Sequence, residues 1–216
     1  EFKKNALSII KSSNFAKDAI LNPVTFYPES LGPNINTDYD EYLPAISADG
    51  TKLIFTRSIY FDGERNEDFY YSEFEGDGWS LSKDFGEPIN SELNEGAQCI
   101  SPDGKILYFT ACGKFNSYGG CDLYKSYFKN NVWSVPINLG SNINSKFWES
   151  QPSISADGNR LFFVSNRDGG FGGKDIWMSY KNLLEEWSTP INLGIKINTS
   201  KDEISPFIHF DNQTLY

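Results

Sequence analysis

The feature that most constrains this chain is a repeat of 54 residues, the interval that separates Trp79, Trp133 and Trp187. An asparagine, a glutamate, a leucine and an Asp-Gly or Asp-Asn pair recur at the same interval. These series are Asn36, Asn90, Asn144 and Asn198; Glu41, Glu95, Glu149 and Glu203; Leu53, Leu107, Leu161 and Leu215; and Asp49-Gly50, Asp103-Gly104, Asp157-Gly158 and Asp211-Asn212. A repeat of this length predicts a propeller or a solenoid rather than one irregular core.

Each unit contains the pattern of four short strands. In the third unit, residues 152–155 and 160–165 are expected to form a hairpin, with Asp157-Gly158 as its two-residue turn. Residues 175–180 alternate apolar and polar side chains, as a half-buried strand does. Residues 187–193 are more polar and include Pro190, which predicts an edge strand. Four antiparallel strands repeated in series predict an all-β fold, a β-propeller of four-stranded blades.

Two motifs resemble a known family of repeats. Residues 154–163 follow the pattern Ile-Ser-Ala-Asp-Gly-x-x-Leu-x-Phe, and residues 172–177 follow Gly-Gly-x-Asp-Ile-Trp. Together they resemble the WD40-like repeat called PD40, which builds the propellers of TolB and of many OmpA-family envelope proteins. The longer motif at residues 133–144 and 187–198, Trp-Ser-x-Pro-Ile-Asn-Leu-Gly-x-x-Ile-Asn, is more similar to the OmpA-linked version. The resemblance covers residues 25–216 and implies a propeller.

The number of units suggests a longer protein. Three units are complete, and a fourth stops within its second strand at Leu215-Tyr216. Because a closed ring needs at least about four blades, we expect further blades outside this sequence. Residues 25–32 align with the Trp-Ser-x-Pro strand, and we expect them to supply an outer strand to the last blade.

Residues 1–24 differ in kind from the repeats. Apolar residues recur there at helical spacing in two groups, which predicts two short helices before Asn22-Pro23. This helical segment is either the end of a tetratricopeptide-type array, as the resemblance to OmpA-linked proteins implies, or a helical cap or linker beside the propeller.

Charge excludes one class of partner. The net charge is −10 and the calculated isoelectric point is about 4.6, so the chain lacks the basic surface that nucleic acid binding requires. The acidic excess either favours basic or neutral partners or serves solubility alone. No stretch is apolar enough to cross a membrane, and we expect no direct membrane insertion.

Cysteine placement indicates the compartment. Cys112 is expected to end one strand and Cys121 to begin the next, so a disulfide between them would close the intervening loop. Such a bond persists only in an oxidising compartment, and the alternative is two free thiols. Cys99 is expected to be a small buried residue.

The loops between second and third strands define one face of the propeller, here called the top face. They span residues 58–67, 113–120 and 166–174, and they combine glycines with exposed aromatic residues. The blade connections that carry the repeated glutamates should open on this face as well. The aromatic residues expected to bind a partner protein are Tyr60, Phe61, Phe115, Tyr118 and Phe171.

The repeated acidic residues allow two interpretations. They could gather a hard cation around the channel, or they could fix turns by accepting backbone N–H bonds. Because they recur in every blade, we expect a structural role and neither a metal nor a cofactor. The residues concerned are Glu41, Glu95, Glu149, Glu203, Asp68, Asp122 and Asp175.

Catalysis finds little support in the sequence. The one histidine, His209, occupies a position that is serine in the other units, and the acids follow the repeat instead of forming a distinct acid and base. We therefore expect no enzymatic activity. The remaining classes are a protein-binding scaffold, a sensor whose channel binds a peptide or glycan, and a propeller glycoside hydrolase, in that order.

The resemblance to OmpA-linked proteins implies a cellular setting. It implies a periplasmic, outer-membrane-associated protein that binds peptidoglycan only through a separate OmpA-like domain. The order of a helical segment, a propeller and such a domain also resembles a periplasmic component of the type IX secretion system of Bacteroidetes. The expected function is accordingly a scaffold that docks other envelope proteins.

Overall fold

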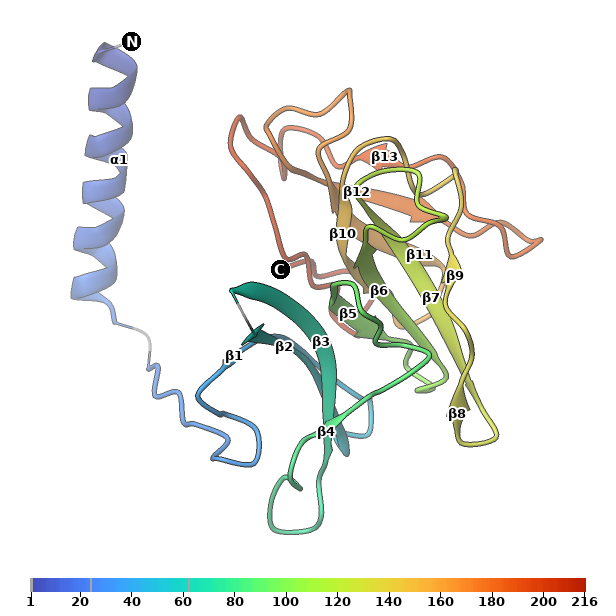
Figure 1. Ribbon diagram of the computed structural model, residues 1–216. Coiled ribbons are helices and arrows are strands. Elements are labelled where there is room, and N and C mark those ends of the chain that lie inside the picture. Colours follow the sequence, from blue (N-terminus) through green and yellow to red (C-terminus); the bar gives the residue numbers. More distant parts are fainter. Residues whose placement is uncertain (1, 24, 62) are drawn as a thin grey trace. The chain divides into compact units, whose positions relative to one another are not determined.

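The computed structural model describes residues 2–23, 25–61 and 63–216, which divide into the units Glu1–Ser30 and Leu31–Tyr216 (Figure 1). The first unit contains a single helix, α1 (Phe2–Leu21). Our prediction of two short helices is wrong, because no glycine or proline interrupts the polar stretch between the two apolar groups. No described helix is long and apolar enough to cross a bilayer. Residues 25–32 form no strand in the described chain; the last blade, to which we expect them to supply one, is not among the three described sheets, so this stays a prediction.

The second unit contains three antiparallel sheets whose strands follow one another in chain order, as expected for propeller blades (Figure 1). The first blade comprises β1 (Asp40–Ile46), β2 (Lys52–Phe61), β3 (Glu64–Glu73) and β4 (Lys83–Asp84). The second comprises β5 (Glu95–Ile100), β6 (Ile106–Cys112), β7 (Cys121–Lys129), β8 (Val132–Trp133) and β9 (Ile137–Asn138). The third comprises β10 (Glu149–Ile154), β11 (Arg160–Ser165), β12 (Asp175–Tyr180) and β13 (Ile191–Asn192).

The start of the fourth unit packs against the third blade without forming a sheet. Ile208 joins Phe162 and Met178 in one apolar cluster, and a single bridge pairs Ile208 with Leu215. The described blades follow one another without closing into a ring (Figure 1). The fold class predicted from the repeat is therefore confirmed as an all-β propeller architecture.

Aromatic side chains fill the space between neighbouring blades. Phe69 of the first blade and Phe109 of the second meet edge to face, with ring centres 5.5 Å apart, and both are fully buried. At the next junction, Tyr108 meets Trp187 with ring centres 6.5 Å apart. The regular spacing of aromatic residues thus becomes a set of equivalent interblade cores.

The repeated asparagines tie each blade connection to the third strand. Each side-chain oxygen accepts a backbone N–H, and each side-chain nitrogen donates to the carbonyl of the same residue. The pairs are Asn90 with Phe69, Asn144 with Leu123 and Asn198 with Ile176, at 2.8–3.0 Å. These amides are buried, so each satisfies two backbone groups that would otherwise lack partners.

The Asp-Gly hairpins differ from the expected two-residue turn. In the third blade, Ser155 N–H donates to the Arg160 carbonyl at 2.9 Å, which leaves residues 156–159 as the loop. The Asp157 carboxylate accepts the Ser155 hydroxyl at 2.5 Å and the Asn159 N–H at 3.0 Å. Only Gly158 has positive φ, at 71°. The aspartate therefore stabilises a longer turn through its side chain.

Candidate functional site

The top-face loop of the second blade, residues 113–120, is anchored at both ends. A disulfide joins Cys112 and Cys121, which lie opposite each other on β6 and β7. The Asp122 carboxylate accepts the N–H groups of Tyr118 at 2.7 Å and Gly119 at 3.0 Å. A Cβ on Gly119 would lie 1.8 Å from the carbonyl oxygen of Phe147, so the loop packs directly on the next blade connection.

The corresponding loop of the third blade, residues 166–174, is held in the same way. Asp175 accepts the N–H groups of Phe171 at 2.5 Å and Gly172 at 3.1 Å. A Cβ on Gly172 would lie 1.8 Å from the Lys201 carbonyl oxygen. Two loops with different sequences are therefore fixed by one aspartate and one closely packed glycine each.

These anchored loops present aromatic side chains to solvent. Phe115 is fully exposed, and Tyr118 and Phe171 are each about half exposed (51% and 50%). Their backbones are fixed by the contacts above, so the exposed rings are held on ordered loops rather than on free chain.

The first blade does not follow this arrangement. Residues 58–67, expected as a loop, continue β2 and β3 in an unbroken ladder to the pair Phe61 and Glu64. Tyr60 is exposed but lies on a strand, beside the Arg65 guanidinium at 6.0 Å from its ring centre. The side chain of Phe61 lies outside the described part. This segment lacks the paired glycines of the other two loops, and its side chains support strand pairing instead.

Two aromatic residues of the top face were missed from the sequence. Phe147 and Trp148 lie on the connection between the second and third blades, and the Lys174 ammonium is 4.6 Å from the Trp148 ring centre. The signal was available, because Leu93-Asn94 and Lys201-Asp202 occupy the same repeat positions. We call the set Phe115, Tyr118, Phe147, Trp148 and Phe171 the aromatic face.

The repeated glutamates make the same local contacts in all four units. Each carboxylate accepts the backbone N–H and the hydroxyl of the residue four positions earlier, which is Thr37, Ser91, Ser145 or Thr199. Three also pair with a cation: Glu41 with Arg57 at 2.8 Å, Glu95 with Lys114 at 2.6 Å and Glu149 with Arg167 at 3.1 Å. These contacts favour a role in blade architecture.

The aspartates differ between blades. Asp122 and Asp175 each accept a third bond from an asparagine amide, Asn138 at 2.7 Å and Asn192 at 2.9 Å. Asp68 receives neither the loop N–H bonds nor the bond from the asparagine that follows the third strand in the other blades. Its Oδ2 accepts from the side-chain amide of Asn66 at 2.9 Å, and its buried Oδ1 has no hydrogen-bond partner among the described residues.

The missing asparagine bond follows from a change of residue at one repeat position. Asp84 stands where the other blades have Asn138 and Asn192. Partial burial, with the nearby charges of Asp84 and Glu95, raises the pKa of Asp68 from 3.8 to about 6. The first blade thus contains an acid that differs from its repeat counterparts, which the repeat pattern alone did not predict.

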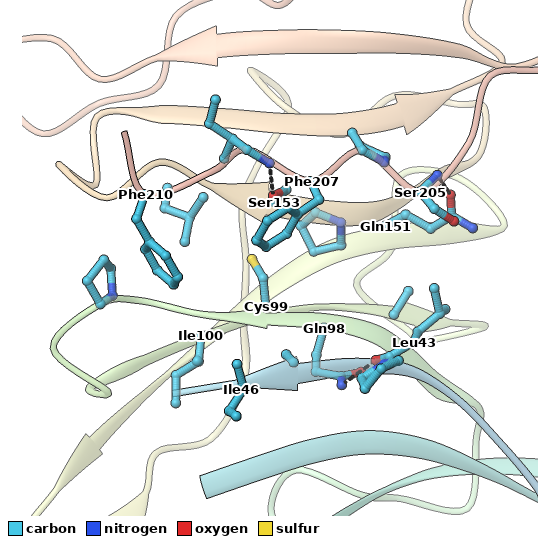
Figure 2. A pocket seen from close by; sticks show the side chains of 18 of the residues that line it. Leu43, Ile46, Gln98, Cys99, Ile100, Gln151, Ser153, Ser205, Phe207 and Phe210 are labelled. Carbon is cyan, nitrogen blue, oxygen red and sulfur yellow. Dashed lines mark hydrogen bonds between the residues drawn. The ribbon is translucent and has the colours of Figure 1, made fainter. Parts of the chain in front are cut away.

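A cavity of about 290 Å³ lies against the innermost strands (Figure 2). β1, β5, β10 and residues 205–210 all contribute to its lining. Each contributes a non-glycine residue with positive φ: Leu43 at 50°, Ala97 at 52°, Gln151 at 55° and Ser205 at 57°. These residues also lie 54 positions apart, but their identities differ, so no recurring residue type marks them.

The cavity wall combines apolar side chains with hydrogen bonds between blades. Gln98 donates to the Leu43 carbonyl at 2.8 Å, and Ser205 N–H donates to the Gln151 side chain at 2.7 Å (Figure 2). Cys99 projects into the cavity near Phe207, and burial raises the pKa of its thiol to about 12. No Asp, Glu or His belongs to the lining in the described chain.

Comparison with known proteins identifies the architecture. No protein-family model matches the sequence, and a search of curated proteins finds no match. Among solved structures, TolB from Acinetobacter baumannii superposes with a TM-score of 0.56 and 16% identity over 84% of this chain and 38% of its own. A TolB-type protein from Agrobacterium tumefaciens gives 0.52 and 15% over 79% of this chain and 56% of its own. The chain is thus a TolB-like β-propeller in fold.

A third neighbour corrects one expectation. A thermostable family-43 glycoside hydrolase superposes with a TM-score of 0.52 and 14% identity, over 82% of this chain and 64% of its own. Our expectation of no enzymatic activity is therefore wrong, because a propeller of the same architecture occurs in a hydrolase. This chain spans less than two thirds of each of these three proteins.

Proposed function

We propose that this chain is a protein-binding propeller scaffold of the bacterial cell envelope. The aromatic face is the observation that supports it. Exposed aromatic side chains on ordered backbone are typical of protein interfaces, because they bury large apolar area with little loss of conformational entropy. Two independent anchors hold each of the loops 113–120 and 166–174, so the backbone that carries these rings is preorganised for a partner.

We further propose a periplasmic, outer-membrane-associated setting. The Cys112–Cys121 disulfide supports an oxidising compartment, of which the bacterial periplasm is one. The Trp-Ser-x-Pro motif supports a link to an OmpA-like domain, through which the whole protein would bind peptidoglycan. A role in type IX secretion is the most specific form of this proposal, with other envelope proteins as the partners.

Site-specific photo-crosslinking tests the proposed interface. A photoreactive phenylalanine analogue placed at Phe115 or Phe171 should crosslink one discrete partner in bacterial envelopes. The control position is Leu183, which is fully exposed on the hairpin between β12 and β13, at the opposite end of the blade. Crosslinks of equal pattern from Leu183, or none from the aromatic face, would contradict the proposal.

A second candidate function is a channel that binds a small ligand. The cavity of about 290 Å³ supports it, because its volume is close to the lower limit for ligand pockets and its walls are mainly apolar with a few polar groups. Native mass spectrometry of the chain isolated from envelopes tests this candidate. A retained small peptide or glycan would favour it, and an empty protein would exclude a tightly bound ligand.

A further inference from the structure

A second cavity, of about 520 Å³, opens at the junction of the first and second blades. Tyr71 and Phe85 of the first blade and Phe128 and Trp133 of the second supply aromatic rings to its wall. Phe85 lies 6.1 Å from Trp133 and 5.2 Å from Tyr71 between ring centres. This volume falls within the range of ligand pockets. We call it the junction cavity.

The charges of the junction cavity favour a positively charged guest. The Lys52 ammonium lies 5.1 Å from the Tyr71 ring centre and 5.9 Å from that of Phe128, and it pairs with Glu73 at 3.2 Å. Glu87 supplies a second carboxylate, on an exposed part of the lining. The lining therefore combines one ammonium, paired with Glu73, with the further carboxylate of Glu87 and several aromatic rings, whose faces attract cations.

In the third blade, the chain itself places a cation beside the tryptophan equivalent to Trp133. Lys181, which pairs with Trp187 as Phe128 pairs with Trp133, holds its ammonium 5.2 Å from the Trp187 ring centre. It also pairs with the Glu185 carboxylate at 3.2 Å. In the described part of the chain, no such cation covers Trp133 or Phe85. An external cation there would reproduce the arrangement of Lys181, Trp187 and Glu185.

The junction cavity is not a requirement of blade architecture. At the next junction, Leu139, Ser141 and Asn142 occupy the repeat positions of Phe85, Glu87 and Pro88. Asn142 donates from its side chain to the Trp187 carbonyl at 2.9 Å, a bond that the proline cannot make. The first junction thus has Phe85, Glu87 and Pro88 where the second has an asparagine that bonds to the next blade. The second junction shows that neighbouring blades pack without the residues of the junction cavity.

We propose that the junction cavity binds an arginine side chain of a partner polypeptide. The planar guanidinium stacks on the rings of Trp133 and Phe85 and pairs with Glu87, a geometry that arginine suits better than lysine. The chain's net charge of −10 favours approach of such a basic segment. This inference rests on the proposed protein-binding function and names the chemistry of one partner contact.

Titration of the full chain with N-acetyl-arginine amide, followed by NMR or calorimetry, tests the inference. N-acetyl-citrulline amide has nearly the same shape without the charge and serves as the control probe. Glu87→Gln and Phe85→Leu are the test variants; both alter residues at the solvent-accessible cavity wall, and the second copies Leu139. The matched control is Glu186→Gln, an exposed glutamate at the next junction.

We expect arginine to bind at least about fivefold more tightly than citrulline, and Glu87→Gln to weaken it about threefold to fivefold. Glu186→Gln should leave binding unchanged. Equal affinity for citrulline, no binding of arginine, or preferential binding of a neutral disaccharide such as N,N′-diacetylchitobiose would each overturn the inference. If arginine fails to bind while crosslinks from the aromatic face persist, the junction proposal fails and the scaffold function stands. If arginine binds while the aromatic face gives no crosslinks, the arginine site stands and the proposed interface at the aromatic face fails.

Discussion

Replacing Asp84 by asparagine should stabilise this protein, because it restores the residue that the other blades carry. Asn138 and Asn192 each donate to an aspartate and accept from a backbone N–H and a second asparagine. Asp84 makes the two accepting contacts through Oδ1, with Gly86 at 2.5 Å and Asn90 at 2.8 Å. Asparagine would keep both of these contacts and add a donor toward Asp68.

The magnitude follows from the pKa of Asp68, which rises from 3.8 to about 6 in the fold. At full strength this difference corresponds to about 3 kcal/mol. Burial is its largest cause and stays in the variant, as does the charge of Glu95, and solvent screens the charge of Asp84, so the expected gain for Asp84→Asn is about 0.5 to 1 kcal/mol at pH 7.5.

The stabilisation by Asp84→Asn should depend on pH in a definite direction. A carboxyl group whose pKa is raised by folding holds its proton more tightly in the native state, so native stability falls as pH rises between 3.8 and about 6. The Asp84→Asn variant should lose less stability over this pH range. Its advantage should therefore be largest above pH 6 and should shrink as pH approaches 4, where Asp68 is protonated and no longer repels the charge of Asp84.

Urea denaturation of the wild type, Asp84→Asn and the exposed control Asp77→Asn at pH 7.5 and 4.5 measures these differences. A variant that is neutral or less stable at pH 7.5 would refute the reasoning. A gain of the same size at both pH values would also refute it, because the benefit would then not depend on the charge of Asp68.

Three further predictions concern the loops and the core. Gly119→Ala should lower the free energy of unfolding by at least about 1 to 3 kcal/mol, since its Cβ meets the Phe147 carbonyl at 1.8 Å, while Gly120→Ala, with nothing within 4 Å, should be nearly neutral by the same denaturation assay. Replacing Cys112 and Cys121 together by serine should lower the free energy of unfolding by about 2 to 3 kcal/mol. A double variant that unfolds at the same temperature as the wild type, under both reducing and oxidising conditions, would argue against this. Phe109→Ala should cost about 3 to 5 kcal/mol, because Phe109 is fully buried between two blades, whereas Phe115→Ala should change stability by less than about 0.5 kcal/mol in the same calorimetric experiment.

The sequence repeat was sufficient to predict the propeller because each blade requires the same groups at the same places. Asn90 and its equivalents satisfy buried backbone groups, and Leu107 and Phe109 fill the space between sheets. Such requirements act within one blade or between neighbouring blades, so the same residue types recur every 54 residues.

The functional features were harder to predict because they depend on departures from the period. Asp84 in place of asparagine, Glu87-Pro88 in place of Ser141-Asn142, and Trp148 in place of a polar residue are visible only when the units are aligned and compared. The positive φ of Leu43 and its equivalents is a backbone property that four different side chains adopt, and no residue identity marks it. The strand ladder of residues 58–67 replaced an expected loop for a similar reason, since pairing across the hairpin decided the conformation.

The most direct test of the scaffold proposal is the affinity of the crosslinked partner for the wild type and for the double variant Phe115→Ala, Phe171→Ala. Both side chains lie on the surface, so the variant should fold normally and bind at least about tenfold more weakly. Leu183→Ala, at the opposite end of the third blade, should bind as the wild type does. Unchanged affinity of the double variant, with loss of binding in Leu183→Ala, would contradict the proposal and move the interface to the other face.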